Sequence, residues 1–258
     1  MNNNFLPNKK LKSVVVEVCC FSVESCLAAE LGGAKRIELC ASLYEGGTTP
    51  SAGLIKLAKQ KISIEIHAMI RPRGGDFCYS EDEILVMQED IRMAKAFGCD
   101  GVVLGILQKD GRVNIAQTKA LVDLAKPMLT TFHRAIDMTP DYGEALENVI
   151  QTGCHRILTS GQKNTAFEGI EAIKKLVKQA SGRIEIMAGS GVNADNAQRF
   201  LYTGVNALHL TGKATRDSEM IYRRAEIMMG GLSEVPEYEI VYSDAEKIRA
   251  VAEILARR

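Results

Sequence analysis

The feature that most constrains this chain of 258 residues is an eightfold alternation of short apolar segments with helix-like segments. The apolar segments show the period of two typical of strands, or short continuous apolar runs, and helical apolar spacing follows them. We predict strands at Val14–Cys19, Arg36–Cys40, Ile64–Ile70, Gly101–Leu107, Met128–Ala135, Arg156–Thr159, Arg183–Ala188 and Ala207–Leu210. Eight consecutive βα units predict a closed parallel barrel, with the reactive groups on the loops that follow the strands.

The stretch EIHAMIRPRGGDFCYS (Glu65 to Ser80) shows one such unit in full. Its strand pattern ends at Pro72, and two glycines then allow a ligand to approach the main chain closely. Ser80 and Glu83 form a capping box at the start of the next helix. Arg71 and Arg73 are therefore expected at the carboxyl end of a buried strand.

The chain is predicted to be a single α/β domain, a TIM (β/α)8 barrel spanning residues 1–258. The barrel core covers about 14–213, and a C-terminal extension covers about 214–258. A doubly wound sheet would show GxGxxG after its first strand, where this chain has Cys19-Cys20-Phe21-Ser22. The extension should contain a break at Gly230-Gly231, a strand at Tyr238–Tyr242 and a helix capped by Ser243. We expect it to cover a barrel end or to form a contact in a homo-oligomer, a dimer or a tetramer.

Charge and composition favour a small ligand. Lysine plus arginine and aspartate plus glutamate both number 32, so no global positive field attracts nucleic acid or anionic membrane. No apolar run approaches the roughly 18 residues of a membrane span, and the start MNNNFLPNKK is too polar for a secretory signal. Seven cysteines without a CxxC pair indicate reduced thiols. The predicted location is cytoplasmic.

Two cysteines suggest a metal site. Cys19 and Cys40 each follow a glutamate by two residues, in VEVC and IELC, at the carboxyl ends of adjacent strands. Adjacent strands lie about 4.8 Å apart, so the two thiols can meet if their registers match. Cu(I) prefers soft sulfur ligands. The alternative is that these cysteines only fill the core. Further candidate ligands are Cys20, Cys78 and Met69, and a zinc site from the pair plus a histidine remains open.

The same strand ends also carry groups suited to catalysis. Glu17 and Glu38 are carboxylates in apolar strands and need cationic partners or a ligand. Candidate partners are Arg71, His133, Arg134 and His209. A carboxylate near His133 would make it a general acid or base near neutral pH, and Asp137 follows four residues later. The candidate catalytic residues are Glu17, Glu38, Arg71, His133 and Asp137. The alternative is a structural ionic network inside the barrel.

Glycine-rich turns follow the seventh and eighth strands, where barrels often bind phosphate through backbone amides. These turns are Gly189-Ser190-Gly191 and Thr211-Gly212-Lys213. They suggest an enzyme or binding protein for a small phosphorylated or carboxylated metabolite. The candidate anion-binding residues are Arg73, Gly189, Ser190, Gly191, Gly212 and Lys213.

Five stretches, in order along the chain, resemble the CutC family of copper homeostasis proteins. They are RIELC (Arg36–Cys40), EGGTTPS (Glu45–Ser51), IRPRGGDFCYS (Ile70–Ser80), TFHRAIDM (Thr131–Met138) and RILTSGQ (Arg156–Gln162). The resemblance spans roughly Val14 to Lys213 and implies a cytoplasmic TIM barrel that binds Cu(I) through cysteines. We therefore predict Cu(I) binding or handling through Cys19 and Cys40, with the metabolite-binding barrel as the alternative.

Overall fold

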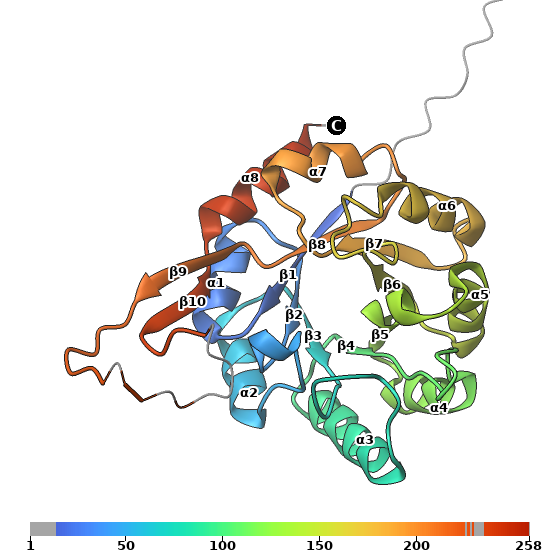
Figure 1. The fold of residues 1–258 in the computed structure, drawn as a ribbon, viewed down its shortest axis with the longest axis horizontal. Coiled ribbons are helices and arrows are strands. Elements are labelled where there is room, and N and C mark those ends of the chain that lie inside the picture. Colours follow the sequence, from blue (N-terminus) through green and yellow to red (C-terminus); the bar gives the residue numbers. More distant parts are fainter. Residues whose placement is uncertain (1–13, 225, 228, 230–234, 258) are drawn as a thin grey trace, which may run out of the picture.

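The computed structural model describes residues 14–224, 226–227, 229 and 235–257, and eight parallel strands in them close into a barrel in chain order (Figure 1). The predicted TIM barrel is confirmed. The strands are β1 (Val15–Cys20), β2 (Arg36–Leu39), β3 (Glu65–Met69), β4 (Gly101–Leu104), β5 (Leu129–Phe132), β6 (Arg156–Thr159), β7 (Glu185–Gly189) and β8 (Ala207–Leu210).

Helices surround the barrel and begin mostly at the polar caps that the sequence predicts. They are α1 (Val23–Leu31), α2 (Ala52–Lys61), α3 (Glu81–Ala96), α4 (Ile115–Ala125), α5 (Tyr142–Thr152), α6 (Ile170–Ala180), α7 (Ala194–Phe200) and α8 (Ala245–Ala256). Ser22, Asn114 and Asp141 each accept a backbone N–H at a helix start. Ser80 and Glu83 form the predicted capping box. Each cap satisfies a donor that has no partner within its helix.

Most strand limits differ from the prediction by one to three residues, and the fourth strand ends at Leu104 and not at Leu107. At two boundaries near the barrel mouth, the difference arises because a side chain binds the backbone. The fifth strand ends at Phe132, because the His133 ring accepts the Ala135 N–H and starts the 3-10 helix η2 (Arg134–Met138). The sequence Thr49-Pro50 predicts a cap at Thr49 for the second helix, but Ser51 caps it. Thr49 instead exchanges hydrogen bonds with the backbone of Arg71.

The core divides into two regions by strand alternation. Outward side chains such as Val18, Ile37 and Ile66 pack against the helices in one large apolar cluster. TIM barrel interiors are usually filled by branched apolar residues. This interior has two small apolar clusters, around Cys40 and around Met187. It also contains many buried polar residues inside or at the mouth, including Glu17, Arg36, Glu38, His67, Arg71, Thr131, His133, Arg156 and His209.

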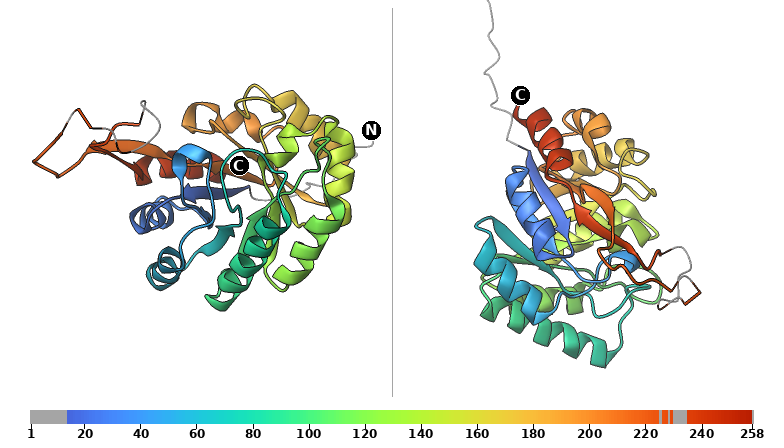
Figure 2. Two further views of the ribbon diagram at one scale, coloured as in Figure 1. Left: turned by 60° about the horizontal axis from the view of Figure 1, so that its bottom comes forward. Right: turned by 90° about the vertical axis from the view of Figure 1, so that its left-hand side faces the viewer.

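The C-terminal extension projects from one side of the barrel (Figures 1 and 2). Strands β9 (Lys213–Asp217) and β10 (Glu239–Ser243) pair antiparallel, and α8 returns to pack against α7 and α1. Asp244, and not the predicted Ser243, caps α8, and Ser243 is the last residue of β10 with its N–H donating to Ser25 Oγ. The break at Gly230-Gly231 and the polar start MNNNFLPNKK lie outside the described residues. The homo-oligomer contact remains a prediction.

No helix in the described part of the chain has both the length and the apolar content that a bilayer span requires.

Candidate functional site

A cavity of about 280 Å³ lies at the carboxyl ends of the strands, and we call it the mouth cavity. Cys19, Glu38 and His209 line it from β1, β2 and β8, and Arg71 and His133 line it from the segments that follow β3 and β5. Its apolar lining includes Phe21, Leu43, Met69, Phe77, Leu158 and Val192. The barrel thus gathers polar groups from distant segments into one space, as the sequence predicts.

The two predicted thiols meet beside this cavity. The sulfur atoms of Cys19 and Cys40 lie 3.7 Å apart, and Met69 packs with them in a small buried cluster. The contact with the Cys40 thiol and the nearby His209 outweigh burial and lower the pKa of Cys19 to about 6. Burial and the neighbouring Cys19 raise the pKa of Cys40. One thiol of the pair is therefore activated at neutral pH.

Space around the thiols comes from a glycine. Gly47 has a positive φ of 94°, and a Cβ there would lie 3.1 Å from the Cys40 sulfur and 3.7 Å from the Met69 methyl carbon. The absence of a side chain lets the loop lie close to the Cys40 sulfur and the Met69 side chain.

Two linked, buried ion pairs hold His209 in place. Its Nδ1 lies 2.8 Å from Glu17 Oε1, and Glu17 also pairs with Arg36 deep in the barrel. Burial disfavours the ionised form of Glu17, but Arg36 and His209 lower its pKa far below the usual range. Burial also disfavours protonated His209, yet Glu38, Cys19 and Glu17 raise its pKa well above normal. Glu17 thus orients the imidazole and leaves Nε2 facing the thiols and Glu38.

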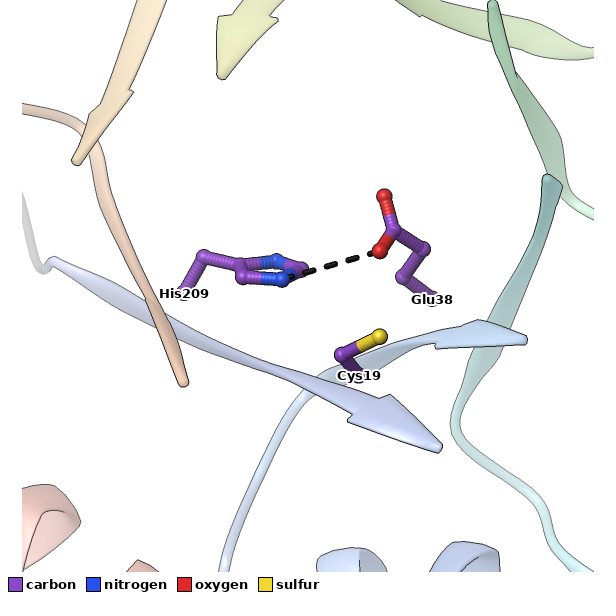
Figure 3. Close-up of side chains that lie close together, drawn as sticks. All are labelled: Cys19, Glu38 and His209. Carbon is purple, nitrogen blue, oxygen red and sulfur yellow. Dashed lines mark ion pairs between the residues drawn. The ribbon is translucent and has the colours of Figure 1, made fainter. Parts of the chain in front are cut away.

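Cys19, Glu38 and His209 point toward one another inside the barrel (Figure 3), and their ligand atoms all lie within 4.8 Å of one another. Glu38 Oε2 lies 3.6 Å from both His209 Nε2 and Cys40 Sγ. Its other oxygen is buried without a hydrogen-bond partner. Burial and the negative charge that forms on Cys19 raise the pKa of Glu38 well above normal. The cluster offers sulfur, nitrogen and oxygen donors to a metal ion.

The opposite wall is built around Arg71, which is 5% exposed. Its Nη1 donates to the carbonyl oxygens of Glu45 and Gly47, and its Nη2 donates to that of Gly75. The guanidinium lies 5.0 Å from the centre of the Phe77 ring. The sequence suggested Arg71 as a partner for the strand carboxylates, but Arg36 fills that role for Glu17.

His133 has one donor without an acceptor among the described residues. Its Nδ1 accepts the Ala135 N–H, so in the neutral ring the proton is on the buried Nε2. Burial and the Arg71 charge lower the pKa of His133 to about 3. The ring lies over Gly105, where a Cβ would come within 2.6 Å of it.

Asp137 does not orient His133, contrary to the expected pairing. It accepts hydrogen bonds from Thr159, from the backbone and hydroxyl of Ser160 and from the backbone of Gln162. Arg134 donates its Nε to the same carboxylate at 3.0 Å. Asp137 is therefore the anchor of the loop after β6 and of Arg134.

The predicted anion-binding residues are not gathered in one place. Ser190 and Gly191 line the mouth cavity, and Gly189 lies below it against His209 and Leu158. Gly212 and Lys213 instead line a second cavity of about 560 Å³ beside α7 and α8. Arg73 lines neither of these cavities, because Asp76 and Glu83 bind it on the loop after β3. These six residues therefore do not form one anion site.

The other predicted sulfur ligands also separate. Met69 packs with the thiol pair, whereas Cys20 faces the helix layer and its thiol contacts the Val18 carbonyl. Cys78 is partly exposed on the loop after β3 and does not line the mouth cavity.

Sequence reasoning missed the roles of Arg36 and Arg156. Arg36 supports Glu17, and Arg156 binds Glu185 at 3.0 Å and the Thr131 hydroxyl at 3.1 Å. Each arginine is the first residue of a short buried strand, RIEL or RILT. This position was the signal in the sequence that could have indicated a buried ion pair. A buried arginine at the start of a barrel strand needs an acidic partner in the interior.

The fold and the site define this protein as a closed (β/α)8 barrel with a cluster of thiol, histidine and carboxylate groups at its mouth. The sequence profile of the CutC family matches residues 14–214. The chain belongs to the CutC family.

Close relatives cover most of the chain. A Homo sapiens protein named copper homeostasis protein cutC homolog is 46% identical over 238 residues, which are 92% of this chain and 87% of the relative. A family protein CutC from Vibrio cholerae is 51% identical over 218 residues, 83% of this chain and 86% of the relative.

Solved structures agree with this assignment. The putative copper homeostasis protein CutC from Streptococcus agalactiae has a TM-score of 0.73 and 37% identity, covering 77% of this chain and 98% of that one. A thiamine phosphate pyrophosphorylase from Pyrococcus furiosus has a TM-score of 0.58 at 16% identity, covering 96% of this chain and 97% of that one. The second likeness concerns the fold alone.

Proposed function

We propose that this CutC family protein binds Cu(I) through the thiolates of Cys19 and Cys40, in the cytoplasm. The observation that supports the proposal most is the 3.7 Å separation of the two sulfur atoms at the barrel mouth. Metal–thiolate bonds are about 2.3 Å long, so both sulfurs can reach one ion without a large movement. The chemistry of the donors also fits, because Cu(I) favours soft ligands and low coordination numbers.

Two further donors stand next to the pair. The thioether of Met69 packs in the same buried cluster and is a soft ligand. His209 Nε2 faces Cys19, and Glu17 holds the other ring nitrogen at 2.8 Å. A carboxylate that fixes the second nitrogen of a histidine is the usual support for a metal-binding imidazole. All seven cysteines are free thiols, as a reducing cytoplasm requires.

The proposal is tested by titrating the reduced protein with Cu(I) in competition with a strong Cu(I) chelator. The wild type should compete for one ion, and the Cys19→Ser, Cys40→Ser double variant should not. Cys78→Ser is the matched control, because Cys78 lies outside the mouth cavity. An unchanged affinity in the double variant would contradict the proposal. Zn²⁺ serves as the comparison metal, because a cysteine and histidine set also suits zinc.

A second candidate function is an enzyme or binding protein for a small phosphorylated or carboxylated metabolite. The observation that favours it is the lining of the mouth cavity, where Glu38, Arg71 and His133 each have a buried polar atom with no hydrogen-bond partner among the described residues. Buried polar atoms usually have partners, so such atoms in a cavity suggest a ligand. A screen of phosphorylated and carboxylated metabolites by thermal shift tests this function, and a complete absence of stabilisation counts against it.

A further inference from the structure

Arg71 is a buried positive charge on the wall of the mouth cavity that follows β3 and β5. It is 5% exposed, and within the described part of the chain it donates to the carbonyl oxygens of Glu45, Gly47 and Gly75. Among the described residues no carboxylate forms an ion pair with Arg71, whereas Arg73 pairs with Asp76 and Glu83. Burying an unpaired charge is costly, so an anion in the cavity would offset that cost.

Two donors on this wall also lack an acceptor among the residues that the structure describes. They are Arg71 Nε and His133 Nε2, and both are buried. Both side chains contact the Phe77 ring, whose centre lies 5.0 Å from the Arg71 guanidinium carbon and 4.8 Å from the His133 ring centre. The Ala135 N–H occupies His133 Nδ1, so the neutral imidazole presents Nε2–H. A carboxylate offers two acceptor oxygens, one for each donor.

The charge and size of the cavity limit the ligand further. Arg134 also lines the cavity, but Asp137 balances its charge at 3.0 Å, which leaves one net positive charge on this wall. A single negative charge is therefore the best match. The volume of about 280 Å³ and the apolar lining of Phe21, Leu43 and Phe77 suit a short organic body. Ligand sites for larger molecules usually measure about 300 to 1,000 Å³.

We propose that the mouth cavity binds a small organic monocarboxylate, whose two oxygens accept hydrogen bonds from Arg71 Nε and His133 Nε2. The proposal rests on the second candidate function and does not require copper. Charge-assisted hydrogen bonds of this kind are among the stronger ones in proteins. The apolar part of the ligand lies against the side chains of Phe21 and Leu43.

The test is calorimetric titration of the metal-free, reduced protein with acetate, propionate and butyrate. Propionamide has the same shape as propionate without the charge, and inorganic phosphate tests the competing anion class. His133→Asn keeps a short acceptor for the Ala135 N–H and removes the Nε2 donor, so it tests binding with little change in the fold. Arg71→Gln removes the charge, and Arg92→Gln on the exposed face of α3 is the matched control.

We expect the wild type and Arg92→Gln to bind a carboxylate and not propionamide. His133→Asn should bind it at least about tenfold more weakly, a factor equal to about 1.4 kcal/mol. Arg71→Gln should weaken binding similarly, with circular dichroism confirming that both variants are folded. Equal affinity in His133→Asn and wild type would overturn the proposal, as would phosphate binding more tightly than every carboxylate. Those results leave the second candidate function standing, whereas failure of every metabolite in the broader screen counts against both.

Discussion

The sulfur atoms of Cys19 and Cys40 lie 3.7 Å apart although 21 residues separate them in the chain. They meet because β1 and β2 are adjacent and parallel, with Cys19 opposite Glu38 in the register. Cys40 follows directly after β2, and its N–H binds the Cys20 carbonyl. Alternation turns both side chains inward, so the pair is a product of the barrel and not of a local motif.

The low pKa of Cys19 predicts its reactivity. Iodoacetamide should modify Cys19 with a rate that rises through a midpoint near pH 6, because the thiolate is the reactive form. Cys154, whose pKa burial raises to about 11, is the internal control and should react slowly across this range. Peptide mapping by mass spectrometry measures both rates in one sample. A midpoint for Cys19 above pH 8 would show that its neighbours do not stabilise the thiolate.

The ion pair of Arg36 with Glu17 predicts a large loss of stability when it is broken. Arg36→Met leaves a buried carboxylate without its main partner and should cost about 3 to 5 kcal/mol. Arg183→Ala removes a half-exposed partner of Glu147 and should cost less than about 1 kcal/mol. Urea unfolding followed by circular dichroism measures both.

Adding Glu17→Gln to Arg36→Met should recover part of the loss, because the uncompensated charge is then gone. No recovery in the double variant would mean that Arg36 stabilises the barrel by packing alone.

The contact between Gly101 and the ring of His67 predicts a steric effect. A Cβ at Gly101 would lie 2.5 Å from the buried His67 ring, so Gly101→Ala should cost about 1 to 3 kcal/mol through overpacking. Gly53→Ala in α2 meets no atom closer than 3.9 Å and should instead stabilise by about 0.5 to 1 kcal/mol. Opposite signs in chemical unfolding would confirm the difference, and equal effects would contradict it.

The buried histidines predict a loss of stability in acid. The pKa of His133 is lowered to about 3 in the folded protein, from a normal value of 6.5. Below pH 6.5 the unfolded chain binds a proton that the folded chain does not, so stability falls until the pH reaches the folded pKa. Two pH units below 6.5, the loss from one such histidine is about 3 kcal/mol at 1.36 kcal/mol per unit.

His133→Asn should make the stability between pH 6.5 and 4.5 less dependent on pH than in the wild type. His67, whose pKa is also lowered to about 3 by burial, should keep the remaining dependence. Identical pH profiles of unfolding free energy for the variant and the wild type would contradict this assignment.

The architecture was predictable because each strand carries its own signal. The limits of β6 and β8 match the predicted ones, since apolar runs and polar ends define them. The fifth strand ends early because the His133 side chain binds the backbone, and strand periodicity does not contain that information. Likewise, Ser51 and not Thr49 caps α2, because Thr49 binds the backbone of Arg71 on the neighbouring segment after β3.

The residues of the candidate site were easier to predict than the residues that they contact. The ExC pattern placed Cys19 and Cys40 at neighbouring strand ends, where the structure brings them together. The pairing of Asp137 with His133 was wrong in geometry, because a sequence separation of four says nothing about the loop after β6 that Asp137 binds. The partner of Glu17 depends on the register of β1 with β2, which fixes Arg36 beside it and only the fold reveals.

X-ray absorption spectroscopy of the reduced protein loaded with one equivalent of Cu(I) tests the central claim most directly. The account predicts two copper–sulfur bonds from Cys19 and Cys40, with a third ligand from Met69 sulfur or His209 nitrogen. Both thiolate bonds should disappear in the Cys19→Ser, Cys40→Ser variant and persist in Cys78→Ser. A copper environment of nitrogen and oxygen alone in the wild type, or an unchanged spectrum in the double variant, would contradict it.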